Sequence, residues 1–141
     1  NMKRTLADVD HSMATTKVHS FNTITTLVHH TNYYVNAVSK VLEGEALNAR
    51  DHLSFDHPPI GSEEDWQKLK EQSLTDAEHF ASLIEQLHPS KLGEIFIEPK
   101  YGTYYRNLQG IVEHVHYHLG QIVLIKKLVI ERRIGLATNA T

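Results

Sequence analysis

The feature that most constrains the fold is a long apolar stripe near the C-terminal end, in which aliphatic residues recur three and four positions apart. Its members are Leu108, Ile111, Val112, Val115, Leu119, Ile122, Ile125 and Val129. From about Thr103 to Arg133 the pattern covers about eight turns at 3.6 residues per turn, and no β-strand runs that long. Gly110 and Gly120 each cost about 1 kcal/mol relative to alanine in such a helix, which indicates close packing at both positions. The core is therefore predicted to form around one long helix.

A second amphipathic helix is predicted over residues 22–43, where apolar residues recur with the same spacing. Ser20 or Asn22 offers a side-chain oxygen that can cap its N-terminus, and Gly44 suits the left-handed conformation that often ends a helix. The following segment, 45–62, contains Pro-Pro and a glycine, so we expect a long loop there.

A third helix is predicted over residues 63–87, preceded by the capping-box pattern of Ser62 and Asp65. Residues 92–102 alternate only briefly between apolar and polar side chains and are expected to form an extended connection. In residues 4–18 the apolar positions are sparse, so only a short helix is predicted. The predicted fold class is therefore all-α.

Composition limits the functions that this chain can have. Its 141 residues suit a single domain, residues 1–141. The absence of cysteine excludes disulfides, thiolate metal sites and cysteine nucleophiles, so nitrogen and oxygen must hold any metal. A net charge of -3 argues against nucleic-acid binding. We also expect no membrane span and a cytoplasmic location.

Histidine is the unusual residue type, with eleven copies. In EHVHYHLGQIV, residues 113–123, three histidines occupy alternate positions. At about 100° per residue from Ile111, His118 falls about 20° and His114 about 60° from the stripe, whereas His116 falls about 140° away. The same count on the earlier helix turns His30 toward the inside edge and His29 away from it.

Two inward imidazoles at i and i+4 need partners, because each unsatisfied ring nitrogen costs roughly 1 to 3 kcal/mol in a buried site. One interpretation is structural, with the rings bonded to backbone groups or tyrosine hydroxyls. The other is a divalent metal, since H-x-x-x-H on a helix is a ligand spacing. The metal interpretation needs a third ligand, for which His30 is favoured.

Two blocks of the chain resemble one known family. NTITTLVHHTNYY, residues 22–34, is similar to a block that ends in a metal-binding histidine, and EHVHYHLGQI, residues 113–122, is similar to an H-x-x-x-H-x-G-Q-I signature. Both resemble the DinB/YfiT-like superfamily of four-helix-bundle metalloenzymes. The resemblance implies metal ligands at His30, His114 and His118.

The resemblance extends from about Thr5 to Ile134 and implies an up-down four-helix bundle whose first helix is short or missing. His29 is the second choice for the ligand in its block. Family members carry a full helix before this block, whereas only about twenty residues precede it here. Either residues 1–18 supply a shortened helix, or an upstream helix lies outside this chain, or a partner covers the open groove. We therefore expect a homodimer.

The resemblance also implies a function. Three neutral imidazoles leave a divalent ion, zinc or nickel, with an open position for water or substrate. Relatives include thiol S-transferases and isomerases, so the expected enzyme is a metal-dependent transferase, or a hydrolase, acting on a small-molecule substrate with a low-molecular-weight thiol. Gln121 and Tyr34, one turn from ligands, are candidate supports, and Asp56 and His57 are weaker candidates at the site mouth. The alternative is a non-catalytic metal-binding or interaction bundle.

Overall fold

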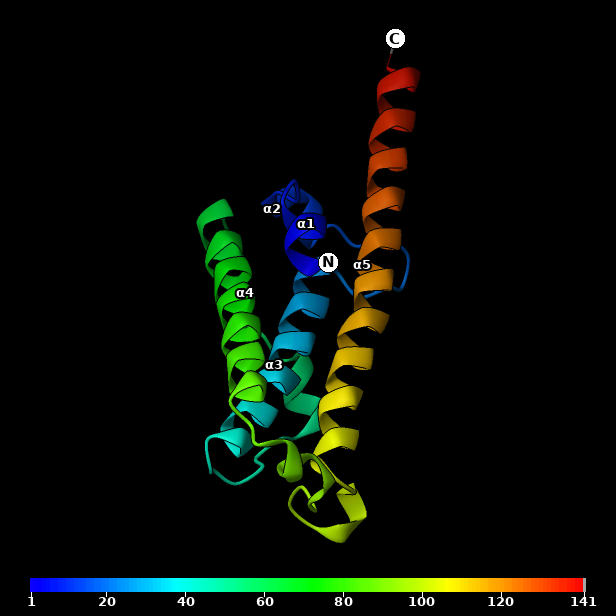
Figure 1. The fold of residues 1–141 in the computed structure, drawn as a ribbon. Coiled ribbons are helices and arrows are strands. Elements are labelled where there is room, and N and C mark those ends of the chain that lie inside the picture. Colours follow the sequence, from blue (N-terminus) through cyan, green and yellow to red (C-terminus); the bar gives the residue numbers. More distant parts are fainter. Residues whose placement is uncertain (141) are drawn as a thin grey trace.

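The computed structural model describes residues 1–140, and within them it is all-helical, as the sequence predicts (Figure 1). The five α-helices are α1 (Met2–Leu6), α2 (His11–Thr15), α3 (Ile24–Leu42), α4 (Glu63–Glu85) and α5 (Tyr104–Asn139). Three short 3₁₀ helices lie in the connections: η1 (Asp51–Phe55), η2 (Pro89–Gly93) and η3 (Pro99–Tyr101). The one β-type contact in this part of the chain is an isolated bridge between Ile95 and Thr103.

Helix α3 is central, because it packs against α4 on one side and against α5 on the other (Figure 1). The short helices α1 and α2 lie at one end, where α1 contacts both α4 and α5. The C-terminal part of α5 extends beyond the other helices (Figure 1). The core divides into two clusters, one around Ile24 and Trp66 beneath the N-terminal segment and one around Val38 and Phe80 at the opposite end.

The N-terminal segment forms two short helices rather than the single helix predicted over residues 4–18. The break falls before α2, where the Asp10 carboxylate accepts a hydrogen bond from the Met13 amide at 2.7 Å and starts a new helix. Leu6 is fully buried, and the buried Trp66 indole donates to the Val9 carbonyl at 2.7 Å. Residues 1–18 thus cover one end of the groove that a full helix would fill.

The start of α3 differs from the prediction, since Thr23 caps it rather than Ser20 or Asn22. The Thr23 hydroxyl accepts from the Thr26 amide at 3.1 Å. The sequence allowed several capping residues in a row, and the backbone conformation selects one of them. The end agrees with prediction, because Gly44 takes a positive φ of 93° directly after the helix.

The other boundaries follow the predicted caps more closely. Ser62 accepts from the Asp65 amide at 3.1 Å and begins α4 as predicted. Helix α5 begins after the Thr103 cap but continues to Asn139, beyond the predicted end at Arg133. The connection over residues 92–102 contains 3₁₀ turns and one bridge instead of a continuous extended segment.

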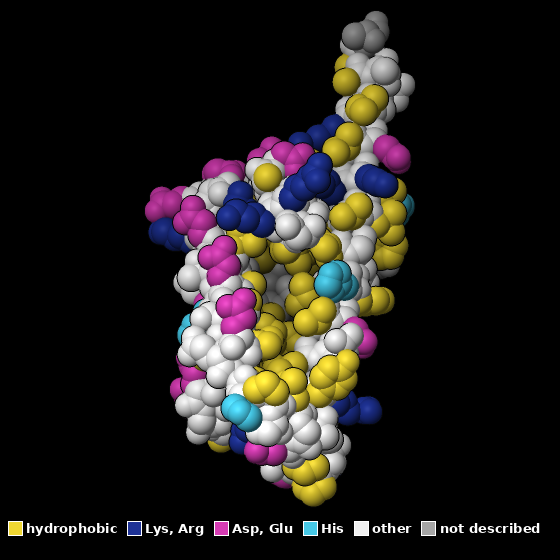
Figure 2. Space-filling model, in the orientation of Figure 1, with side chains coloured by type: hydrophobic (Ala, Val, Ile, Leu, Met, Phe, Trp, Pro, Cys, Tyr) yellow, Lys and Arg dark blue, Asp and Glu magenta, His cyan; other side chains and the backbone are white. Residues whose placement is uncertain are grey.

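A hollow lined by hydrophobic side chains lies between α4 and α5 below the N-terminal segment (Figure 2). The residues around it are Met2, Val28, Thr31, Asn32, Val35, Ser73, Leu74, Ala77 and Val115. The homodimer expected from such an open face stays a prediction. None of the helices within residues 1–140 combines the length and apolar character that a membrane span requires.

The glycines of α5 are not sites of close packing, which corrects the prediction. A Cβ added at Gly110 or Gly120 would meet no atom within 4 Å outside the local backbone. Both glycines are exposed on the outer surface of the helix.

We expect Gly110→Ala to raise the free energy of unfolding by about 0.5 to 1 kcal/mol, because alanine loses less backbone entropy in a helix. Chemical denaturation measures this change. Gly102→Ala is the matched control and should lower it, since Gly102 has a φ of 75° and its Cβ would lie 2.8 Å from Arg106 Cδ. Destabilisation by Gly110→Ala would mean that this surface of α5 is covered.

Candidate metal centre

Three histidines from two helices meet in the interface between α3 and α5. His30 comes from α3, while His114 and His118 lie one turn apart on α5. One ring nitrogen of each lies within 4.8 Å of the others. His30 and His118 are buried and His114 is half-buried. The structure therefore brings together the three residues that the helical count and the family resemblance select.

The distances within this group, the histidine cluster, suit a metal ion. His114 Nε2 lies 3.1 Å from His30 Nε2 and 3.0 Å from His118 Nε2. Imidazole nitrogens bound to zinc at about 2.0 to 2.1 Å in tetrahedral geometry lie about 3.3 Å from one another. These two separations therefore lie within a few tenths of an ångström of the zinc-bound value, and the third pair of ligand nitrogens lies within 4.8 Å.

The hydrogen-bond network assigns the proton position on His30. The Ser54 hydroxyl donates to the Asp51 carbonyl at 2.6 Å. Its oxygen, 2.8 Å from His30 Nδ1, must therefore accept a hydrogen from that nitrogen. A neutral His30 then carries no hydrogen on Nε2, which presents its lone pair to the cluster.

A hydrogen bond to Gln121 likewise fixes the proton position on His118. Its Nδ1 lies 2.6 Å from the Gln121 Oε1, a carbonyl oxygen that can only accept. His118 Nε2 therefore also presents a lone pair, and His114 Nε2, which lies between the two, carries one hydrogen at most. A neutral cluster cannot satisfy all three nitrogens, whereas a bound cation satisfies every lone pair. The residues present therefore fit a divalent ion.

The surroundings of His30 and His114 favour their uncharged form. Burial, together with the neighbouring His118 and His114 rings, lowers the pKa of His30 to about 4. Burial also lowers the pKa of His114, with a contribution from His118. The Phe55 ring stacks on His30, with centroids 4.2 Å apart and planes at 19°. Neutral imidazole is the form that binds metal, so the site is prepared for an ion near pH 7.

A cavity of about 260 Å³ adjoins the cluster and gives access to it. Its lining residues are His30, Tyr34, Asp51, Ile111 and His114. The Tyr34 hydroxyl donates to the Asp51 carboxylate at 2.5 Å. Burial, together with this hydrogen bond, raises the pKa of Tyr34, so the phenol keeps its proton. Tyr34, predicted as a support, thus forms a polar wall together with a carboxylate.

Sequence reasoning missed the contribution of η1. This short helix supplies Asp51, Ser54 and Phe55, all of which contact the cluster or its partners. The segment has no apolar period, and it lies in what the sequence predicts as a loop. The run DHLSF contains no pattern that would predict a helix or a contact with His30. Gln121, in contrast, was predicted and supports His118 directly.

The weaker candidates lie outside the cluster. The His29 ring faces His57, with centroids 5.6 Å apart, and is not part of the three-residue group. His57 in turn shares a 3.0 Å hydrogen bond with the Thr26 hydroxyl, and Asp56 is exposed. His116 is exposed and its Nδ1 donates to the Val112 carbonyl at 2.8 Å, consistent with its predicted outward direction.

Comparison of the chain with protein-family models, with curated proteins and with solved structures finds no match. The DinB/YfiT-like resemblance therefore stays a prediction.

The pKa of His30 predicts a pH dependence for the metal-free protein. Unfolded His30 protonates near 6.5, whereas folded His30 stays neutral down to about 4. In this window the unfolded state binds more protons, so the free energy of unfolding falls as the pH falls from 6.5 toward 4. Denaturation at several pH values should show a smaller slope for His30→Asn than for wild type.

His116→Asn is the control, because this exposed histidine lies outside the cluster, and it should keep the wild-type slope. Equal slopes for wild type and His30→Asn would show that His30 titrates in the folded protein as it does in the unfolded chain.

Proposed function

We propose that the histidine cluster binds one divalent ion, zinc or nickel, through His30, His114 and His118. The observation that supports this most strongly is the convergence of three Nε2 atoms, 3.0 to 3.1 Å apart at the two closest pairs. Ser54 and Gln121 turn the His30 and His118 lone pairs inward. Both metals suit imidazole ligands, and hydrogen-bonded second partners of this kind accompany most histidine ligands.

We propose further that the chain belongs to the DinB/YfiT-like superfamily. Its two similar blocks fall on α3 and α5, the helices that carry the cluster. The order of the helices is compatible with a four-helix bundle in which α1 and α2 occupy part of the place of the first helix.

The adjoining cavity supports a catalytic site rather than a closed structural one. A structural ion is surrounded by protein ligands, whereas a catalytic ion keeps a position for water or substrate. Here three protein ligands and an adjoining cavity of about 260 Å³ favour the open arrangement. A non-catalytic metal-binding bundle would not require an adjoining cavity.

The proposed activity is a metal-dependent transfer onto a low-molecular-weight thiol from a small-molecule substrate. The ion would lower the pKa of a bound thiol or water molecule. The chain would favour the neutral form of His30 and His114, and it would orient His30 through Ser54 and His118 through Gln121. Tyr34 donates its only hydroxyl hydrogen to Asp51 in the cavity wall, so its oxygen can accept a hydrogen bond from a bound substrate.

Elemental analysis of the purified protein tests the metal site. We expect about one zinc or nickel ion per wild-type chain and a loss of that ion in His118→Ala, since two ligands bind far more weakly than three. His116→Ala is the matched control on the same helix and should keep its metal. Metal retained by His118→Ala would remove the basis of the proposal.

The transferase activity is tested separately with a panel of low-molecular-weight thiols and chlorodinitrobenzene. In this reaction the thiolate sulfur forms a bond to the ring carbon, and chloride leaves. We expect conjugation by the metal-loaded wild type and none above background by His118→Ala. A loaded protein that conjugates no thiol would favour the non-catalytic bundle.

Ser54→Ala tests the positioning of His30. Removing the acceptor of His30 Nδ1 should weaken zinc affinity by about 10- to 100-fold, the usual effect of losing a ligand's outer partner. Competition with a chelator of known affinity measures this change. Ser39→Ala is the matched control, because Ser39 is a buried α3 serine whose hydroxyl donates to the Val35 carbonyl and lies outside the cluster. Equal losses in both variants would indicate a general effect on folding.

A further inference from the structure

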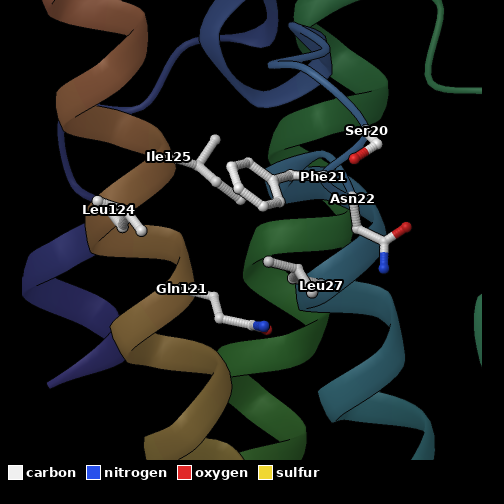
Figure 3. A pocket seen from close by; sticks show the side chains of 7 residues that line it. All are labelled: Ser20, Phe21, Asn22, Leu27, Gln121, Leu124 and Ile125. Atoms are coloured by element: carbon white, nitrogen blue, oxygen red, sulfur yellow. The ribbon is translucent and has the colours of Figure 1, made fainter.

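A second cavity, of about 250 Å³, lies on the other side of the histidine cluster, between α3, α5 and the segment before α3 (Figure 3). Its lining residues are Ser20, Phe21, Asn22, Leu27, Gln121, Leu124 and Ile125. Leu27 lies one turn before His30 on α3, and Gln121 lies one turn after His118 on α5. We call this cavity the Phe21 pocket.

We propose that the Phe21 pocket binds a small, uncharged, mainly apolar compound with one hydrogen-bond acceptor, and that this compound is the electrophilic substrate of the thiol. The thiolate sulfur forms a bond to one carbon of the compound while the bond from that carbon to a leaving group breaks, and the leaving group departs with the electron pair. The substrate role depends on the proposed function, whereas binding to the pocket can be measured without it.

The walls of the Phe21 pocket are mainly apolar. Leu27 and Ile125 are almost fully buried and form its base, whereas Phe21 is 47% and Leu124 52% exposed at its sides. In Figure 3 the Phe21 ring extends toward Ile125, above Leu27. A ligand between these side chains would remove the exposed ring and methyl groups from water, which is worth roughly 25 cal/mol per Å² of apolar area.

The Phe21 ring is presented by an ordered turn. The Phe21 amide donates to the Val18 carbonyl at 3.1 Å, which closes the turn. His19 within it has a φ of 51°, a left-handed conformation that is uncommon for residues other than glycine. The His19 ring also contacts Phe21 edge-on, with centroids 6.3 Å apart. These contacts pre-organise the wall, which lowers the entropy cost of binding.

The polar lining determines the class of ligand. Ser20, Asn22 and Gln121 are its polar members, and none of the lining residues is charged. A charged ligand would lose water without gaining an ionic partner, so a neutral compound is favoured. The volume lies below the roughly 300 Å³ at which pockets for drug-sized ligands begin, which suits a single ring with a short substituent.

Gln121 connects the Phe21 pocket to the histidine cluster. Its Oε1 accepts from His118 Nδ1 at 2.6 Å, which directs the amide nitrogen away from His118. Among residues 1–140 that nitrogen has one recorded acceptor, the Tyr117 hydroxyl at 3.4 Å, so its second hydrogen can donate to a ligand. A metal on His118 Nε2 keeps the proton on Nδ1 and thereby holds Gln121 in this orientation.

The test uses acetophenone, a neutral ring with one carbonyl acceptor, on the full chain. Titrations followed by ¹H–¹⁵N NMR should shift the Phe21 backbone amide and the Gln121 side-chain amide. We expect acetophenone to bind more tightly than toluene, which lacks the acceptor, and than benzoate, which is charged. We also expect affinity about fivefold higher for the zinc-loaded protein than for the metal-free protein, at the lower end of typical couplings between sites.

Leu124→Glu is the blocking variant, because it adds a charge to the pocket wall at a half-exposed position. It should weaken acetophenone binding at least tenfold while zinc content and helix content stay unchanged. Leu136→Glu is the matched control, an exposed leucine on the same helix far from the pocket, and it should bind acetophenone as wild type does.

The outcomes separate this proposal from the metal proposal. Zinc binding without acetophenone binding would overturn the proposal for the Phe21 pocket and would leave the proposal for the metal centre standing. Equal acetophenone affinity in wild type and Leu124→Glu also overturns the pocket, since the compound then binds elsewhere. Binding that depends on Leu124 but not on zinc overturns the substrate role. A protein that binds acetophenone in the pocket but no zinc overturns the metal centre and not the pocket.

Discussion

The contact between His30 of α3 and the His114–His118 pair of α5 is the constraint on which the rest of the structure depends. Three imidazoles in an apolar interface would be costly if their nitrogens were unsatisfied. Two of them are held by Ser54 and Gln121, which leaves lone pairs facing inward. The arrangement could therefore hold a cation. It forms only when η1 packs against α3 and α3 packs against α5.

The histidine cluster lies between two cavities of different character along the same interface. On one side Tyr34 and Asp51 provide a proton donor and its acceptor. On the other side Phe21 and its neighbours provide an apolar wall with only neutral polar groups. Such a division suits a reaction in which one reactant needs polar contacts and the other needs apolar burial. Gln121 connects the two, because it accepts a hydrogen bond from His118 and also lines the Phe21 pocket.

The helical periods predicted the three long helices closely, because the side-chain direction on a helix repeats every 3.6 residues and is a local property. The inward His30, His114 and His118 and the outward His116 follow from this rule alone. Local rules were less successful where several residues compete for one role, as at the cap of α3, where Thr23 replaces the predicted Ser20 or Asn22. They also gave the glycines of α5 a packing role that the structure does not support.

By itself, the sequence determined the helical class, the order of the long helices and the face on which each histidine lies, since these depend on neighbours within a few turns. Only the tertiary structure decided that η1 folds onto α3 and brings Ser54 to His30, a hydrogen bond between residues 24 positions apart. It also decided that residues 1–18 pack as two short helices over one end of the groove. Contacts of this kind depend on how the loops close in space. The loop segments have no periodic pattern, so the sequence near them does not predict these contacts.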